Sequence, residues 1–143
     1  MDLLVREAAP SDAGFIASLL ADLGYPVSSE FAADRLAHFE RDPGSRVQVA
    51  EDGGRVVGLV ATHVVPRLDG EMLSCRIVDI VVAANQRRRG VGSALLAAAE
   101  AEARRQDCRR VDLTSGEWRA EAHVFYERMG FESQSRGYVK RLP

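Results

Sequence analysis

The sequence is poor in lysine, cysteine and long apolar runs, and each scarcity excludes a class of protein. Lys140 is the only lysine among 19 basic residues, so a group of arginines carries little information by itself. The two cysteines, Cys75 and Cys108, are too few for a disulfide framework and lack metal-ligand spacing. No stretch approaches the roughly 18 uninterrupted apolar residues of a membrane-spanning helix. We therefore expect reduced thiols, no metal and no membrane partner, in a cytoplasmic protein.

A strong net charge is also lacking. The 143 residues carry a formal charge of −2 at pH 7, and 46% of them are hydrophobic and 28% charged, which is the balance of an ordinary globular domain. Aromatic residues are not interleaved with the arginines, so we expect no nucleic-acid partner. The first residues show no basic region followed by an apolar one, so no secretory signal is expected. The length fits one domain over residues 1–143.

The spacing of apolar residues predicts a mixed α/β layer of alternating strands and helices. Strands are expected at residues 3–8, in a hairpin over 46–65, and at 72–84, 109–114 and 131–142. Helices are expected at residues 10–24, 28–44, 90–106 and 118–130. Ser11 or Asp12 can cap the first helix, and Ser28 or Ser29 the second. The nearly continuous apolar run 77–82 makes the strand at 72–84 the one we expect to be most buried.

A glycine-containing turn joins that strand to the next helix. The residues Arg87-Arg88-Arg89-Gly90-Val91-Gly92 precede the helix, where free N–H groups and the positive end of the helix dipole suit a pyrophosphate. Gly90 and Gly92 lack Cβ atoms, so a phosphate can approach the backbone closely. The same residues also fit a bent turn with solvated arginines, because short glycine motifs are common.

Several segments resemble the GNAT family of N-acetyltransferases. Residues 87–92 fit the acyl-CoA motif of that family, R/Q-x-x-G-x-G/A, and "IVDIVVAAN" is similar to its central strand. "HVFYERMGF" is similar to its second signature, and the order of segments agrees from about residue 3 to residue 142. The resemblance implies the GNAT acyl-CoA N-acyltransferase fold, a central mixed, mostly antiparallel sheet flanked by about four helices. It also implies an acetyl-CoA-dependent N-acetyltransferase acting on a primary amine.

Coenzyme A is the polyanion that this resemblance implies for the glycine turn. Its pantetheine arm would bond to the strand backbone at Ile80–Val82 as an added strand does, and the amides of residues 88–93 would hold its pyrophosphate. The implied cofactor-binding residues are Ile80, Val81, Val82, Arg87, Arg88, Arg89, Gly90, Val91, Gly92, Ser93, Arg119 and Ala122. Arg88 stands where many members have glycine. Arg119 replaces an asparagine found in many members, so it contacts either coenzyme A or the acceptor.

Tyr126 matches the general acid of the family, which protonates the departing thiolate. A phenol with a pKa of ~10 can supply a proton to a thiolate of similar basicity. The alternative is that Tyr126 is a half-buried aromatic residue that packs between helix and sheet.

Asp79 is the only carboxylate within the apolar run 77–82 and is our candidate for the general base. Alternation places it on the same face of the strand as Val81. A carboxylate in a buried strand is costly unless it is paired or useful. The alternative role is a salt bridge to an arginine such as Arg76.

The acceptor is the part of the reaction that the sequence leaves open. The resemblance implies that the first two helices wall the acceptor site, with Tyr25 and Phe31 as lining residues. Small amines, aminoglycosides, amino acids, polyamines and proteins all fit a primary-amine acceptor. The rival function is an acyl-CoA-binding module of the same fold without turnover, in which Tyr126 is purely structural. A homodimer is compatible with the resemblance.

Overall fold

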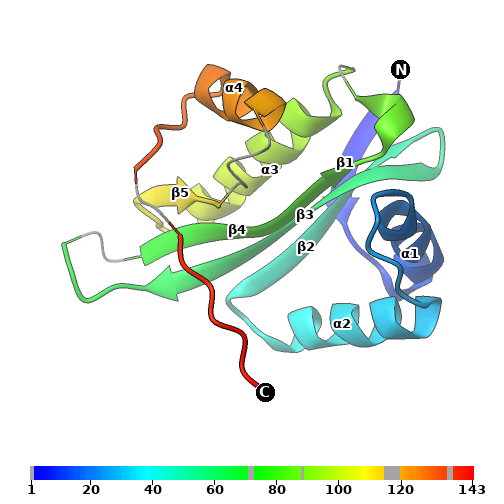
Figure 1. Cartoon of the computed structure of the whole chain (residues 1–143), viewed down its shortest axis with the longest axis horizontal. Helices are drawn as coiled ribbons and strands as arrows, with labels where there is room; N and C mark the ends of the chain where they lie inside the picture. Colours follow the sequence, from blue (N-terminus) through cyan, green and yellow to red (C-terminus); the bar gives the residue numbers. More distant parts are fainter. Residues whose placement is uncertain (1, 71–72, 88, 115–119, 135–136) are drawn as a thin grey trace. The chain divides into compact units, whose positions relative to one another are not determined.

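The computed structural model describes residues 2–70, 73–87, 89–114, 120–134 and 137–143. They form two compact units, Met1–Asp112 and Leu113–Pro143, and each unit is treated by itself below. Figure 1 shows the elements of both units along the chain. Within the described part of the chain, no helix is long and apolar enough to cross a membrane.

The first unit is built on a five-stranded sheet in the order β1-β2-β3-β4-β5. The strands are β1 (Leu3–Glu7), β2 (Ser45–Asp52), β3 (Arg55–Pro66), β4 (Leu73–Val82) and β5 (Arg110–Asp112). Every neighbouring pair is antiparallel except β4 and β5, which are parallel. Gly53 and Gly54, both at positive φ, form the tight β2–β3 turn. The mixed, mostly antiparallel sheet and the hairpin predicted from the sequence are confirmed.

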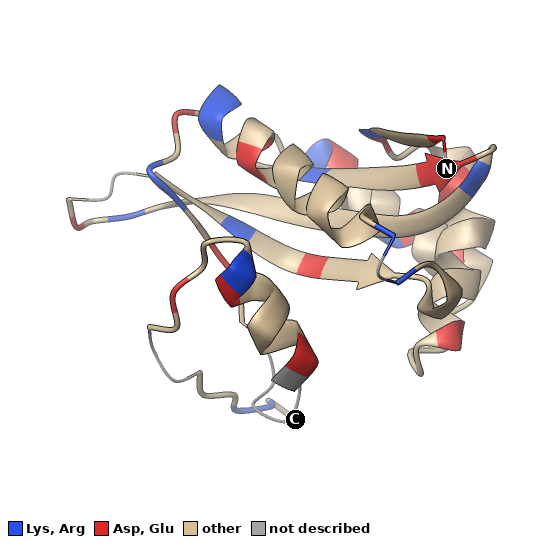
Figure 2. Cartoon of the chain, turned by 90° about the horizontal axis from the view of Figure 1, so that it is seen from above, with Lys and Arg blue, Asp and Glu red and all other residues tan. Residues whose placement is uncertain are grey.

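Helices cover both faces of this sheet (Figure 1). A short 3-10 turn, η1 (Pro10–Asp12), leads into α1 (Ala13–Asp22), and α2 (Ser29–Arg41) follows. These two helices bury one face, where residues such as Ile16 and Ala32 pack with Val49 and Leu59 of the sheet. After a second 3-10 turn, η2 (Ala84–Gln86), helix α3 (Val91–Arg105) packs on the opposite face. In Figure 2, positions of basic and acidic residues alternate along these elements.

The two predicted helix caps have different outcomes. Ser28 accepts a hydrogen bond from the Phe31 N–H at 3.0 Å and caps α2, as expected. Asp12 precedes α1, but its side chain makes no capping bond to that helix. Its carboxylate instead accepts from the Ala9 N–H and from the Arg6 guanidinium, so it ties β1 to η1.

The strand expected to be most buried is not β4, and that prediction is wrong. In β3, seven consecutive residues, 56–62, are buried, whereas β4 has exposed residues at Val78 and Asp79. The reason is pairing: β3 lies between two long strands, while β4 pairs with β5 only over Ser74–Arg76. A run of apolar residues does not show which strand has neighbours on both sides.

The second unit contains one helix, α4 (Ala120–Arg128), among its described residues. The final strand predicted at 131–142 is not formed: residues 131–134 and 137–143 are irregular. The apolar side chains of this segment, Tyr138, Val139 and Leu142, are exposed, so they do not pack against a surface within this unit. A strand needs a hydrogen-bonded neighbour, and none is present among the described residues of the unit.

Candidate functional site

The end of β4 and the start of α3 form the turn that the sequence singled out. The Ala83 N–H donates to the Val57 carbonyl at 2.9 Å and holds the end of β4 against the start of β3. The chain then passes through η2 to Gly90, which caps α3. The Ala94 N–H makes the helical bond to the Gly90 carbonyl at 3.0 Å, so the amides of Val91 and Gly92 precede the helical ladder and point out of its end.

Gly90 is required by the backbone conformation of this turn. Its φ is +83°, in the left-handed region that disfavours other residues. Apart from its chain neighbours, a Cβ at this position would meet no atom of the described residues within 4 Å. Glycine is therefore needed here for its φ rather than for lack of space. Arg87 and Arg89 flank the turn as exposed residues, Ser93 is half-buried in the first helical turn, and Arg88 lies outside the described residues.

Gly58 of β3, which sequence reasoning missed, sets how closely α3 approaches the sheet. A Cβ there would lie 2.9 Å from the Val81 carbonyl oxygen, 3.0 Å from Leu95 Cδ1 and 3.1 Å from Val91 Cγ1. These distances are shorter than ordinary van der Waals contact, so only glycine fits without displacement. The missing side chain lets the first turn of α3 pack directly over the β3–β4 pair. A glycine inside a predicted strand was the available signal.

The C-terminal half of β4 has one unpaired edge. The whole strand pairs with β3, but β5 pairs only with Ser74–Arg76. Along Ile77–Val82, the edge on the β5 side therefore has no partner strand among the described residues. Ile80, Val81 and Val82 are only half-buried. An extended ligand could pair with this edge and continue toward the α3 N-terminus, which is the geometry that the implied pantetheine contacts require.

Asp79 lies beside a β-bulge in the middle of β4. Across the β3–β4 pair, Ala61 faces Asp79 and Thr62 faces Ile77, so Val78 is the extra residue. The register continues without a break from Asp79 to Val81, which confirms that these two share a face. Asp79 is an exposed residue. Burial of part of its side chain nevertheless raises the pKa of the carboxyl group above its ordinary value.

The alternative salt bridge between Asp79 and Arg76 is not formed. The Arg76 Nη1 donates to Asp112 Oδ1 at 2.7 Å, and Ser74 Oγ donates to Asp112 Oδ2 at 2.6 Å. Asp79 has no ion pair among the described residues, and burial of part of its side chain raises its pKa. Asp112 was not predicted as a site residue, because its place beside β4 depends on the β4–β5 pairing.

Tyr126 and Ala122 lie on α4 in the second unit, and both are half-buried. The Tyr126 ring packs against Phe125 and edge-on against Phe131, with ring centroids 5.5 and 5.8 Å apart. The Phe131 N–H donates to the Tyr126 carbonyl at 2.9 Å, which closes the helix after Gly130. These contacts hold the Tyr126 ring within its own unit, whereas packing of the ring against the sheet stays a prediction. Arg119 lies outside the described residues.

The remaining candidates separate into surface and core. Tyr25, in the loop after α1, and Phe31, in α2, are both exposed, and the Arg35 guanidinium lies 5.5 Å from the centre of the Phe31 ring. Cys75 is fully buried, and burial raises the pKa of its thiol to about 11, which leaves it protonated and unreactive. Within the described residues, no group of three His, Cys, Asp or Glu side chains could hold a metal.

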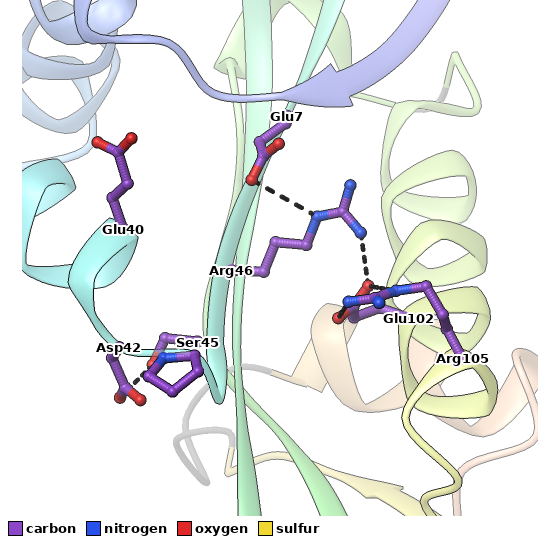
Figure 3. A pocket seen from close by; sticks show the side chains of 8 residues that line it. Glu7, Glu40, Asp42, Ser45, Arg46, Glu102 and Arg105 are labelled. Carbon is purple, nitrogen blue, oxygen red and sulfur yellow. Dashed lines mark hydrogen bonds and ion pairs between the residues drawn. The ribbon is translucent and has the colours of Figure 1, made fainter.

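A charged cavity of about 500 Å³ lies away from the predicted site residues. Its lining residues are Glu7, Glu40, Asp42, Pro43, Ser45, Arg46, Glu102 and Arg105. Figure 3 shows Arg46 between Glu7 and Glu102, with Arg105 also directed at Glu102. The Arg46–Glu102 ion pair joins β2 to α3, so the cavity marks a structural contact between sheet and helix.

Comparisons with known proteins agree on one family. The model of the acetyltransferase (GNAT) family matches residues 14–131. The chain is 30% identical to an aminoalkylphosphonate N-acetyltransferase of Salmonella typhimurium, over 96% of this chain and 90% of that protein. An acetyltransferase structure from Trypanosoma brucei superposes with a TM-score of 0.83 at 28% identity, covering 99% of this chain and all of that one. A transcriptional regulator structure from Bacillus halodurans superposes with a TM-score of 0.91 over 99% of this chain and all of that one, and at 23% identity shows the fold alone.

Proposed function

Because the chain belongs to the GNAT family and is an N-acetyltransferase, we propose that it moves the acetyl group of acetyl-CoA to a primary amine by direct attack of that amine. The observation that carries this proposal is the unpaired edge of β4, which leads into the glycine turn at the N-terminus of α3. We propose that both compact units belong to one acetyltransferase domain that acts in the cytoplasm.

Coenzyme A is held, in this proposal, by backbone more than by side chains. The carbonyl and N–H groups of Ile80–Val82 bind its pantetheine arm, and the amides of residues 88–93 bind its pyrophosphate. Arg87 and Arg89, both exposed, add charge-assisted bonds to the phosphates. Ala122 adds a further cofactor contact, and Arg119 contacts either coenzyme A or the acceptor. When bound, acetyl-CoA supplies the activated acetyl thioester.

Two side chains move the protons of the reaction. Asp79 takes the proton of the attacking amine, directly or through a water molecule, and its raised pKa brings it closer to the range of a useful base. The Tyr126 hydroxyl donates a proton to the sulfur as the thiolate leaves. Its ring contacts with Phe125 and Phe131 hold the side chain in place for this step.

The acceptor is a small amine rather than a protein in this proposal. The Salmonella relative, an aminoalkylphosphonate N-acetyltransferase that this chain matches over nearly its whole length, supports testing aminoalkylphosphonates first. Because fold alone does not fix an acceptor, other small amines belong in the same panel.

Acetyl-CoA binding and turnover test the proposal in sequence. At a hundredfold excess over Kd, acetyl-CoA should stabilise the fold by about 2.7 kcal/mol, measured as a rise in the midpoint of urea unfolding. Release of free coenzyme A should then depend on an added amine. Binding without release for any amine would favour the acyl-CoA-binding module, and no binding at millimolar acetyl-CoA would contradict both functions.

A further inference from the structure

The bulge in β4 brings two opposite charges to one face of the sheet. In a regular strand, residues three positions apart point to opposite faces, as Arg76 and Asp79 would. The extra residue, Val78, changes this. Across the strand pair, Arg76 faces His63 and Asp79 faces Ala61, and these two β3 residues are two positions apart on the same face. Arg76 and Asp79 are therefore neighbours on that face, with a Cα separation of about 7 Å.

Arg76 is held in place yet remains accessible. Its Nη1 is bonded to Asp112 Oδ1, and the other oxygen of Asp112 is fixed by the buried hydroxyl of Ser74. The Arg76 side chain is still 41% exposed. A guanidinium that is already ordered by one carboxylate loses little conformational freedom when it binds a second anion.

Asp79 supplies the complementary negative charge. Asp79 is an exposed residue with a partly buried side chain, and among the described residues it has no ion pair with Arg76 or another cation. The two charges thus share a face without neutralising each other directly. This arrangement is complementary to a small molecule that carries one positive and one negative group.

We propose that the acceptor is a primary amine that also carries an acidic group, and that Arg76 binds that group. The inference rests on the proposed function, because Asp79 receives the amine. The orientation follows from the strand: Asp79 directly precedes Ile80–Val82, the part of the unpaired edge proposed to bind coenzyme A, whereas Arg76 lies on the other side of the bulge. A separation of about 7 Å suits amino acids and aminoalkylphosphonates, in which amine and acid are two or three bonds apart.

Three amines of similar length test this specificity: 2-aminoethylphosphonate, β-alanine and n-propylamine, the last without an acidic group. The wild-type protein should acetylate one or both acidic amines with a kcat/KM at least about tenfold above that of propylamine, the effect of one charge-assisted hydrogen bond. Arg76→Gln should reduce this ratio to near one, through KM more than kcat. Arg76→Lys should restore part of it, and Arg104→Gln, on the exposed side of α3, should keep the wild-type ratio.

Each outcome decides the inference. A preference for phosphonate over β-alanine, or the reverse, identifies the acid while supporting the role of Arg76. A wild-type ratio near one, or an unchanged ratio in Arg76→Gln, overturns it. If acetyl-CoA binds but no amine is acetylated, the proposed function fails, and calorimetry of 2-aminoethylphosphonate and β-alanine with the coenzyme A complex then decides. If either acidic amine binds the wild-type complex and binds at least about tenfold more weakly to Arg76→Gln, the inference is supported. If neither amine binds the wild-type complex, or if Arg76→Gln binds them equally well, the inference is overturned.

Discussion

Asp79 is the residue whose surroundings bear most directly on mechanism. Among the described residues no cation pairs with its carboxylate, and burial of part of the side chain raises its pKa. A carboxyl group with a raised pKa in the folded state binds its proton more tightly there than in the unfolded chain. The ionised form present at neutral pH therefore costs stability. A residue kept at such a cost fits a functional role better than a structural one.

Asp79→Asn should separate the catalytic role from a structural one. We expect kcat/KM to fall by roughly 10²-fold or more and the acidic limb of its pH profile to disappear. We also expect the variant to be more stable than the wild type at neutral pH. That advantage should vanish as the pH falls below about 3.9, where the unfolded carboxyl is also protonated.

Kinetics and urea unfolding on the same purified protein check both parts of this prediction. Asp107→Asn is the matched control: Asp107 is exposed in the turn after α3 at a positive φ of 57°, which asparagine tolerates well. Asp107→Asn should change neither kcat/KM nor the free energy of unfolding. Lower stability with normal turnover in Asp79→Asn would return this residue to a purely structural role.

Tyr126→Phe tests the proposed general acid. The substitution removes one hydroxyl and keeps the ring contacts with Phe125 and Phe131, so α4 should keep its packing. We expect kcat to fall by about 10²-fold, with acetyl-CoA affinity nearly unchanged. Tyr138→Phe, at an exposed tyrosine of the same unit, serves as the control. An unchanged kcat, in conditions where chemistry limits turnover, would remove Tyr126 from the mechanism.

At the scale of elements, the contact of α3 with β3 sets the position of the proposed phosphate site. Gly58 lets Val91 and Leu95, both fully buried, rest directly on the strand. The Val81 carbonyl that a Cβ would meet belongs to the segment proposed to bind pantetheine. One glycine thus positions both parts of the proposed cofactor site.

Gly58→Ala should weaken both the fold and the binding of acetyl-CoA. Overpacking at this contact should cost about 1–3 kcal/mol of unfolding free energy, and the displaced α3 N-terminus should raise the Kd for acetyl-CoA. Gly14→Ala in α1 is the control, since its Cβ would meet only Ser29 Oγ at 3.9 Å and alanine favours a helix. Urea unfolding and calorimetry measure the two effects. Wild-type affinity in a destabilised Gly58→Ala protein would show that this contact does not position the site.

The elements themselves were largely predictable, whereas their partners were not. Periodicity and turn residues predicted four helices and the β2–β3 hairpin, because these signals act within short stretches of chain. The bulge at Val78, the short β4–β5 pairing and the place of Asp112 depend on residues far away in sequence. The strand expected at 131–142 failed for the same reason, since a pattern cannot supply the neighbour that a strand needs.

Over the first unit as a whole, a buried carboxylate joins sheet and helix. The side chain of Glu102 on α3 is 1% exposed and accepts hydrogen bonds from Arg105 and Gln106 of its own helix region and from Arg46 of β2. Burial alone would raise its pKa, but these three donors outweigh burial and hold it at about 2. Figure 3 shows Arg46 and Arg105 converging on this carboxylate.

The low pKa of Glu102 makes the stability of the protein depend on pH in a predictable direction. Because the folded pKa lies below the ordinary value of 4.5, the ionised carboxylate stabilises the fold at every pH above about 4.5. That contribution is lost progressively as the pH falls from about 4.5 toward 2. The pKa of Asp12 is also lowered, mainly by its hydrogen bonds with Arg6. Its contribution to stability should therefore also be lost as the pH falls.

Glu102→Gln should therefore destabilise the protein most at neutral pH. Removing the charge takes away the buried carboxylate that binds the half-buried Arg46 and leaves Arg46 with the exposed Glu7, which should cost about 3 kcal/mol of unfolding free energy. Urea unfolding between about pH 7 and pH 3 should show the gap between wild type and variant narrowing as the wild-type carboxylate is protonated. Glu100→Gln, two residues earlier on α3, should follow the wild-type curve, because the Glu100 side chain makes no hydrogen bond or ion pair with the described residues. A gap that stays constant over this range would mean that the Glu102 contacts stabilise the fold through packing rather than through charge.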